Sequence, residues 1–152
     1  MTEPSTPAPE LVVQRRINAL PPTVFSFFTD AGRWMSWQGE DAEIDPRPGG
    51  VLRMNVREGN VASGRFVTIE PYHRIVFTWG WEMPGNPLPP GGSTVDITLR
   101  PDGAGTVLTL THRGLPLELF QSHGLGWNHY MDRLLTRAEG GDPGPDNGPE
   151  QD

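Results

Sequence analysis

Two histidines are the side chains in this sequence whose chemistry and placement best suit proton transfer. His112 lies near the end of a strand-like run, 106–113, and His123 lies in a helix-like run, 117–138. Because the pKa of an unperturbed imidazole lies close to neutral pH, either residue is suited to act as a general acid or base. Neither has a catalytic partner beside it in the sequence. A histidine held by a backbone carbonyl or by water is therefore the alternative interpretation.

Tryptophan is the second informative residue type, because small-molecule pockets are lined mainly by aromatic and apolar side chains. The five tryptophans fall in one helix-like stretch, one strand-like run and the last helix-like run: Trp34, Trp37, Trp79, Trp81 and Trp127. If the last helix lies across the sheet, their rings and a few polar groups enclose a cavity. A solid core of large side chains is the alternative interpretation.

Several other kinds of site are excluded by the residue types present. The sequence has no cysteine, which excludes disulfides, thiolate zinc sites and cysteine nucleophiles. His123 and His129 lie on different faces of the predicted helix, and no HExxH, GxSxG or Walker motif is present. We therefore expect no metal ion and no cofactor.

The charge balance argues against a nucleic-acid partner. Nineteen acids oppose 12 basic residues, all of them arginine, for a net charge of -7. Six of those acids lie in the Pro/Gly-rich ends, 1–10 and 140–152, which hold no arginine. The segment 11–139 is thus nearly neutral and lacks the clustered cations that nucleic acid attracts. We expect one domain over 11–139 with a disordered tail at each end.

The apolar runs are too short to span a bilayer, and the first residues lack the basic and apolar runs of a signal peptide. We therefore expect a cytoplasmic protein without membrane contact.

Hydrophobic periodicity predicts the elements that must position these side chains. A strand at 11–18 precedes two short helices over 21–37, which begin at Pro21 and break at Gly32. Six further strands and a last helix follow, at 42–45, 50–57, 61–70, 73–82, 93–100 and 106–113, then 117–138. This order predicts an α+β fold with helices on one face of a curved antiparallel sheet.

Strand register decides which side chains face inward. Around the turn at 101–105, pairing Ile97 with Leu110 and Val95 with His112 keeps one apolar face, because a slip of one residue would expose it. His112 then faces inward, and Asp96 lies on the outer face.

The same argument for 63–81 pairs Val67 with Phe77 and Ile69 with Ile75, and it sets Arg65 opposite Trp79. An inward Arg65 would stack on the indole and bind an anion, or else extend to the sheet edge. The proline-rich loop at 83–92 is either a lid over the cavity or a tolerated insertion.

An ordered set of short motifs resembles a known superfamily over about residues 11–137. The motifs are GG at 49–50, G-x(5)-EP from Gly64, then FTW, LTH and H-x-x-GW. The set resembles the SRPBCC (START-like, helix-grip) superfamily, in the branch named after the activator of the ninety-kilodalton heat-shock protein's ATPase. The resemblance implies a seven-stranded antiparallel sheet around a long C-terminal helix, with a deep hydrophobic cavity between them.

By position, the resemblance and the registers together give nine candidate ligand-binding residues: Trp37, Met54, Arg65, Phe77, Trp79, His112, His123, Trp127 and Met131. The leading hypothesis is binding of a small hydrophobic or aromatic molecule, with no catalytic residue assigned. One alternative is a polyketide cyclase or aromatase that uses His112 or His123 as acid or base, with Arg65 stabilising an enolate. Another is a module that binds a chaperone or a regulator.

Overall fold

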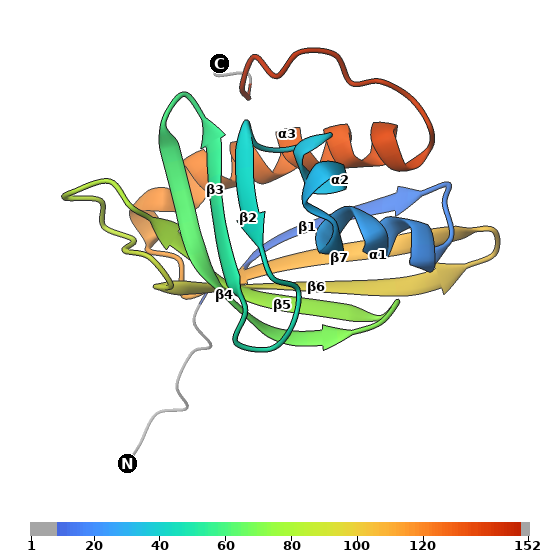
Figure 1. The fold of residues 1–152 in the computed structure, drawn as a ribbon, viewed down its shortest axis with the longest axis horizontal. Helices are drawn as coiled ribbons and strands as arrows, with labels where there is room; N and C mark the ends of the chain where they lie inside the picture. The colour runs from blue at the N-terminus through green and yellow to red at the C-terminus, as the bar shows by residue number, and fades with distance from the viewer. Residues whose placement is uncertain (1–8, 150–152) are drawn as a thin grey trace.

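A seven-stranded antiparallel sheet curves around a long helix within residues 9–149, the part of the chain that the structure describes (Figure 1). In this computed structural model the strand order across the sheet is β1-β7-β6-β5-β4-β3-β2. The strands are β1 (Leu11–Ile17), β2 (Asp41–Ile44), β3 (Val51–Arg57), β4 (Asn60–Glu70), β5 (Arg74–Trp81), β6 (Ser93–Asp102) and β7 (Gly105–Arg113). The helices are α1 (Pro21–Thr29), α2 (Ala31–Met35), the 3-10 helix η1 (Leu117–Leu119) and α3 (Phe120–Ala138).

The predicted α+β architecture and order of elements are confirmed. Of the two tails expected to be disordered, residues 1–8 and 150–152 lie outside the described residues. No helix between residues 9 and 149 has the length and apolar character that crossing a bilayer would take.

The two short helices after β1 are separated at Asp30. Pro21 and Pro22 occupy the first turn of α1, where a missing backbone N–H costs nothing. Asp30 then adopts an extended backbone that ends α1, and its carboxylate accepts the N–H of Arg33 to begin α2. Gly32 lies inside α2, so the prediction of a break at Gly32 was wrong.

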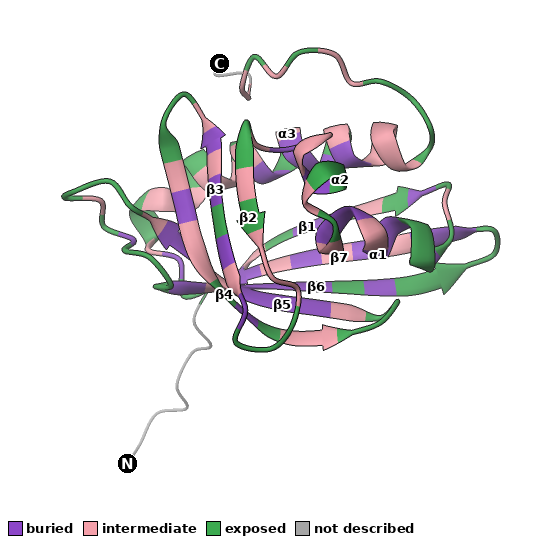
Figure 2. Cartoon of the chain, in the orientation of Figure 1, coloured by how far each residue is buried: buried purple, intermediate pink, exposed green. Residues whose placement is uncertain are grey.

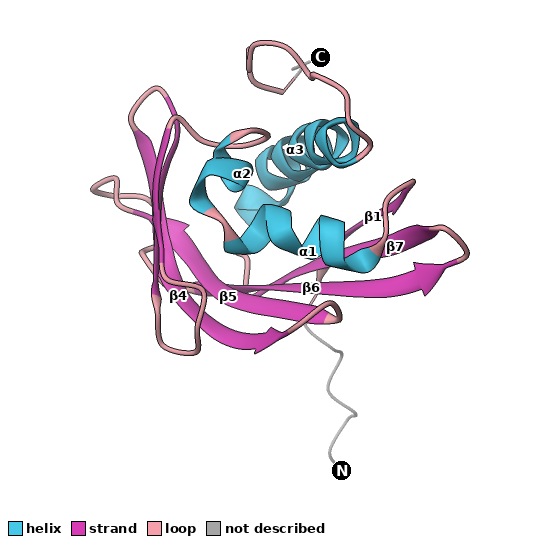
Figure 3. Ribbon diagram, turned by 45° about the vertical axis from the view of Figure 1, so that its right-hand side comes forward, coloured by secondary structure: helices cyan, strands magenta, loops and turns pink. Residues whose placement is uncertain are grey.

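The core lies between the concave face of the sheet and the three α-helices, which lie on that side (Figure 3). Buried positions alternate with more exposed ones along β3, as one covered sheet face requires (Figure 2). Trp34 and Trp37 are fully buried and stack with ring centroids 5.7 Å apart. The helical pair thus fills its part of the concave face with tightly packed aromatic rings.

The predicted register of β6 and β7 is confirmed, with Ile97 opposite Leu110 and Val95 opposite His112. In β4 and β5, Ile69 lies opposite Ile75 as predicted, but the register then shifts between Phe66 and Thr68.

The prediction that Val67 faces Phe77 and that Arg65 faces inward was therefore wrong. The irregularity is a β-bulge, which adds a residue to one strand and exchanges the two faces beyond it. Phe66 lies opposite Phe77 in the core, and Val67 is 50% exposed. Arg65 is exposed and donates a hydrogen bond to the carbonyl of Gly49.

Asp96 lies on the outer face of the sheet, as predicted, where it is nearly fully buried beneath two arginines. Arg74 donates two hydrogen bonds to its carboxylate, at 3.0 and 2.8 Å, and Arg113 donates one at 2.8 Å. The hydrogen bonds from Arg74, with the one from Arg113, outweigh the effect of burial and lower the pKa of Asp96. The three side chains tie β5, β6 and β7 together.

Replacing Asp96 with asparagine is expected to lower the free energy of unfolding at neutral pH by about 2 kcal/mol, because charge-assisted hydrogen bonds are lost. Asp102→Asn is the control, since its pair with Arg16 is about half exposed and contributes little. Urea unfolding measures both. The Asp96 contribution is present above the pKa of an unfolded aspartate, ~3.9, and is lost as the pH falls through the lowered folded pKa. Equal losses in the two variants would contradict this account.

Candidate functional site

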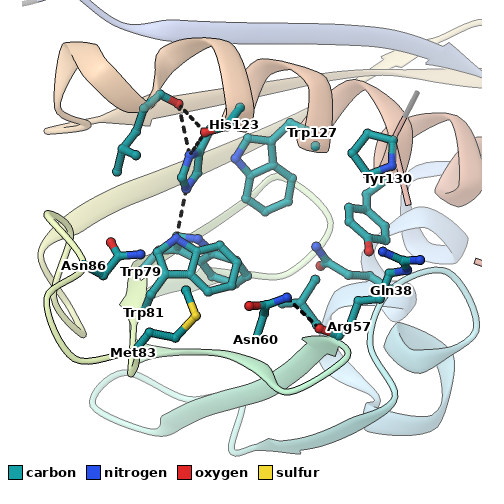
Figure 4. A pocket seen from close by; sticks show the side chains of 15 residues that line it. Gln38, Arg57, Asn60, Trp79, Trp81, Met83, Asn86, His123, Trp127 and Tyr130 are labelled. Carbon is teal, nitrogen blue, oxygen red and sulfur yellow. Dashed lines mark hydrogen bonds between the residues drawn. The ribbon is translucent and has the colours of Figure 1, made fainter. Parts of the chain in front are cut away.

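A pocket of about 320 Å³ opens between α3 and the neighbouring ends of β3, β4 and β5 (Figure 4). Its helical wall consists of Leu119, Ser122, His123, Gly126, Trp127 and Tyr130. Its other walls consist of Gln38, Val56, Arg57, Asn60, Trp79, Trp81, Met83, Asn86 and Pro149. This volume and a mainly apolar lining with three tryptophans are typical of a site for a small ring compound.

The structure places the nine predicted site residues in three different surroundings. Three line the pocket: Trp79, His123 and Trp127. Five are fully buried in the core outside the pocket lining: Trp37, Met54, Phe77, His112 and Met131. Arg65 lies on the outer face of the sheet and does not line the pocket.

Both ring nitrogens of His123 are hydrogen-bonded, one to the sheet and one to the end of η1. The indole N–H of Trp81 donates to Nε2 at 3.0 Å (Figure 4). Because Nε2 accepts this bond, the proton lies on Nδ1, which is 3.1 Å from the carbonyl of Leu119. Burial lowers the pKa of His123, although the bond to Leu119 acts in the opposite direction. The ring is therefore neutral at physiological pH.

His112 is held in the same way behind the wall of the pocket. The indole N–H of Trp127 donates to Nδ1 at 3.0 Å, and Nε2 lies 2.7 Å from the hydroxyl oxygen of Ser93. Since the Ser93 hydroxyl donates to the carbonyl of Trp79 at 2.7 Å, the His112 Nε2–H must donate to Ser93. Burial, with a smaller effect of His123, lowers the pKa of His112 to about 3.

The two histidines therefore position the aromatic wall. Each one accepts an indole N–H, from Trp81 or Trp127, and each uses its second nitrogen as a donor inside the protein. Neither imidazole has a nitrogen left for a bound molecule, and both are neutral. This arrangement fixes the orientation of the rings of Trp81 and Trp127 on opposite sides of the pocket.

Trp79 is the exception among the tryptophans of the pocket. Its indole N–H is the one buried side-chain nitrogen or oxygen within residues 9–149 that has no hydrogen-bond partner. Its ring packs against those of Trp81 and Trp127, with centroids 5.6 and 5.3 Å apart. Because this nitrogen has almost no accessible surface, its N–H is an unsatisfied donor within the wall, which is a costly arrangement.

The loop 83–92 forms one rim of the pocket. Met83 and Asn86 line the space, while Leu88 is buried in the core and its carbonyl accepts the N–H of Trp81. The Asn86 side chain accepts the N–H of Leu88, which fixes the turn between them. The loop is thus anchored at Leu88, and its first residues face the pocket.

The segment that follows α3 forms another rim. We expected a disordered tail from residue 140, but residues 142–149, here called the C-terminal strap, turn back along α3 toward β2 and β3 (Figure 1). Asp146 accepts the hydroxyl of Tyr130 at 2.7 Å and lies 2.7 Å from His129 Nε2. Arg133 donates to the carbonyl of Gly144 at 3.0 Å. Although burial raises the pKa of Asp146, the bonds from Tyr130 and His129 outweigh it and lower the pKa.

Replacing Tyr130 with phenylalanine is expected to loosen the C-terminal strap while keeping the ring in the pocket wall. The Gly148 N–H bonds to Asp146 at 2.9 Å, so its amide hydrogen exchange reports on this anchor. We expect exchange at Gly148 to become about tenfold faster, the equivalent of one lost charge-assisted hydrogen bond. Tyr72→Phe, at a half-exposed tyrosine in the β4–β5 turn, is the control. Unchanged exchange at Gly148 would show that the strap is held by other contacts.

Some pocket residues that were not predicted could have been found from the sequence pattern, and others could not. Gly126 and Tyr130 lie three and seven residues after His123, on the same face of the helix, and periodicity alone pointed to them. Arg57 reaches the pocket beside a bulge in β3 between Asn55 and Arg57, which leaves no mark in the alternation. Pro149 belongs to the C-terminal strap, where composition pointed to disorder.

The chain is similar to a known protein family and to several solved structures. A family model described as Activator of Hsp90 ATPase homolog 1-like protein matches residues 18–139. The solution structure of an AHSA1-like protein from Rhizobium etli is 40% identical, covering 95% of this chain and 91% of that one, with a TM-score of 0.69. That of CalU16 from Micromonospora echinospora is 30% identical, covering 93% of this chain and 74% of that one, with a TM-score of 0.76.

A third structure, the Aha1 dimer from Colwellia psychrerythraea, shares the fold at 16% identity, covering 87% of this chain and 97% of that one, with a TM-score of 0.74. A comparison with curated proteins finds no match.

Proposed function

The chain belongs to the Activator of Hsp90 ATPase homolog 1-like family, whose helix-grip fold surrounds the pocket described above, and we propose that it binds a small aromatic ligand there as a cytoplasmic binding protein. The observation that carries the proposal is the wall of three indole rings, Trp79, Trp81 and Trp127, around an open space of about 320 Å³. Such rings offer large flat surfaces for stacking against another ring.

The hydrogen bonds of the histidines favour binding over acid–base catalysis. A cyclase that uses His112 or His123 needs an imidazole nitrogen within reach of a bound carbonyl. Indole donors and internal acceptors occupy these nitrogens, and the lowered pKa values keep both rings neutral. We therefore assign the two histidines a positioning role.

Titration of the protein with naphthalene and naphthol, followed by tryptophan fluorescence, tests the proposal. We expect saturable quenching by both compounds with a stoichiometry of one, because the three pocket indoles would lie in contact with the bound rings. Trp127→Leu removes one wall and is expected to weaken binding by about tenfold or more. The control is Leu125→Ala, because Leu125 is an exposed residue of α3 that does not line the pocket. Linear, unsaturable quenching would contradict the proposal.

A further inference from the structure

Arg57 and Gln38 present hydrogen-bond donors at the lining of the pocket. Among the described residues that line it there is no aspartate and no glutamate, and Arg57 supplies the one permanent charge. Figure 4 shows Trp79 and Trp81 on one side of the space, and Gln38, Arg57 and Tyr130 on the other. A cation and unpaired donors around an apolar space favour a ligand that carries acceptor atoms and negative charge.

Gln38 is oriented as a donor by a contact within the core. The residue is only 3% exposed, and its side-chain oxygen accepts the indole N–H of Trp34 at 2.9 Å. That bond fixes which end of the carboxamide is the oxygen, so the NH2 end occupies the opposite position. Because Gln38 also lines the pocket, this NH2 group is available to an acceptor from a ligand.

Arg57 is held at the mouth of the pocket by the protein itself. Its Nε donates to the carbonyl of Asp146 at 3.3 Å, and one terminal nitrogen lies 3.2 Å from the Glu58 carboxylate. Its side chain is one-third exposed, whereas that of Glu58 is 69% exposed. A solvated partner of this kind neutralises the guanidinium only weakly, so the cation can still attract an anion in the pocket.

We propose that the ligand is an anionic aromatic compound, a carboxylate or a phenolate, with its negative group at Arg57 and Gln38. This inference rests on the proposed function, because it names the class of ligand for the same pocket. Arg57 and Gln38 select for negative charge and acceptor atoms, and the three indole rings select for a flat ring system.

Three probes of nearly equal shape test the class of ligand: naphthoate, naphthamide and naphthylmethylammonium, titrated calorimetrically. We expect naphthoate to bind about tenfold more tightly than naphthamide, and the ammonium compound to bind most weakly. The preference for naphthoate is expected to decrease with added salt, since charges near the surface are screened.

Arg57→Gln is expected to abolish the preference for naphthoate over naphthamide, and it keeps a donor of similar size. Arg53→Gln is the matched control, because Arg53 lies on the same strand, pairs with Glu82 and does not line the pocket.

The results distinguish failure of the proposed ligand class from failure of the proposed function. Equal binding of the three probes, or tightest binding of the ammonium compound, would overturn the anionic class and leave a pocket for aromatic rings. The anionic class is also overturned if Arg57→Gln and Arg53→Gln behave alike. If none of the three probes, naphthalene or naphthol binds, the proposed function itself fails and the inference fails with it.

Discussion

Replacing Gly126 with leucine is expected to abolish binding of aromatic ligands while leaving the protein at least as stable. Gly126 lies in α3 and lines the pocket, and a Cβ atom built there meets no other atom within 4 Å. A leucine side chain would therefore extend into the space that the ligand needs. We expect affinity for naphthoate to fall by about 100-fold, because overpacking a filled site costs about 1–3 kcal/mol.

The stability of the Gly126→Leu protein distinguishes blocking from unfolding. Glycine inside a helix costs about 0.8–1.0 kcal/mol relative to alanine, and leucine is nearly as good a helix former as alanine. The variant is thus expected to unfold at equal or higher urea concentration. Gly124→Ala is the control in the same helix, since its Cβ would lie 3.6 Å from Leu11 and outside the pocket lining. Full binding by Gly126→Leu would place the ligand elsewhere.

Acid is expected to destabilise the protein through His112 before the carboxylates titrate. The pKa of His112 is lowered to about 3 in the folded chain, whereas an unfolded histidine has a pKa of ~6.5. Between these values the unfolded chain binds more protons, so the free energy of unfolding falls as the pH falls. Each unit of pH in this window removes about 1.4 kcal/mol for one such group. The lowered pKa of His123 acts in the same direction.

His112→Leu is expected to flatten this dependence between about pH 6 and pH 4.5, a range above the titration of most carboxylates. At neutral pH the variant is expected to lose about 2–3 kcal/mol, since the indole N–H of Trp127 and the hydroxyl of Ser93 both lose a partner. Urea unfolding across the range measures the slope. His73→Leu, in an exposed turn position, is the control and is expected to keep the slope of the unmodified chain. An equally steep slope in His112→Leu would contradict the assignment.

The alternation of apolar and polar residues predicted the register correctly where both strands alternate without interruption. The β6–β7 register followed from one tight turn and two regular alternating strands, and it is confirmed. The β4–β5 register failed at Val67, because a bulge removes one residue from the ladder without changing the residue types around it. The inward position of Arg65 depended on that register and failed with it.

The pocket was harder to predict than the fold, because facing inward does not distinguish a cavity from a packed core. Trp37 and Trp79 both face the concave side, yet α2 packs directly over Trp37, while the space beside Trp79 stays open. The C-terminal strap was missed for another reason. Its composition is that of a disordered segment, and its position depends on specific partners such as Tyr130, which only the folded chain brings near Asp146.

The most direct test of binding in the pocket is to follow the five indole N–H signals by NMR while naphthoate is added. The signals of Trp79, Trp81 and Trp127 are expected to shift and saturate together, because the three rings line the pocket. The signal of Trp37 is expected to stay fixed, because its N–H donates to the carbonyl of Phe27 in the core. Saturable shifts confined to residues outside the pocket, with the three indoles unmoved, would contradict the account.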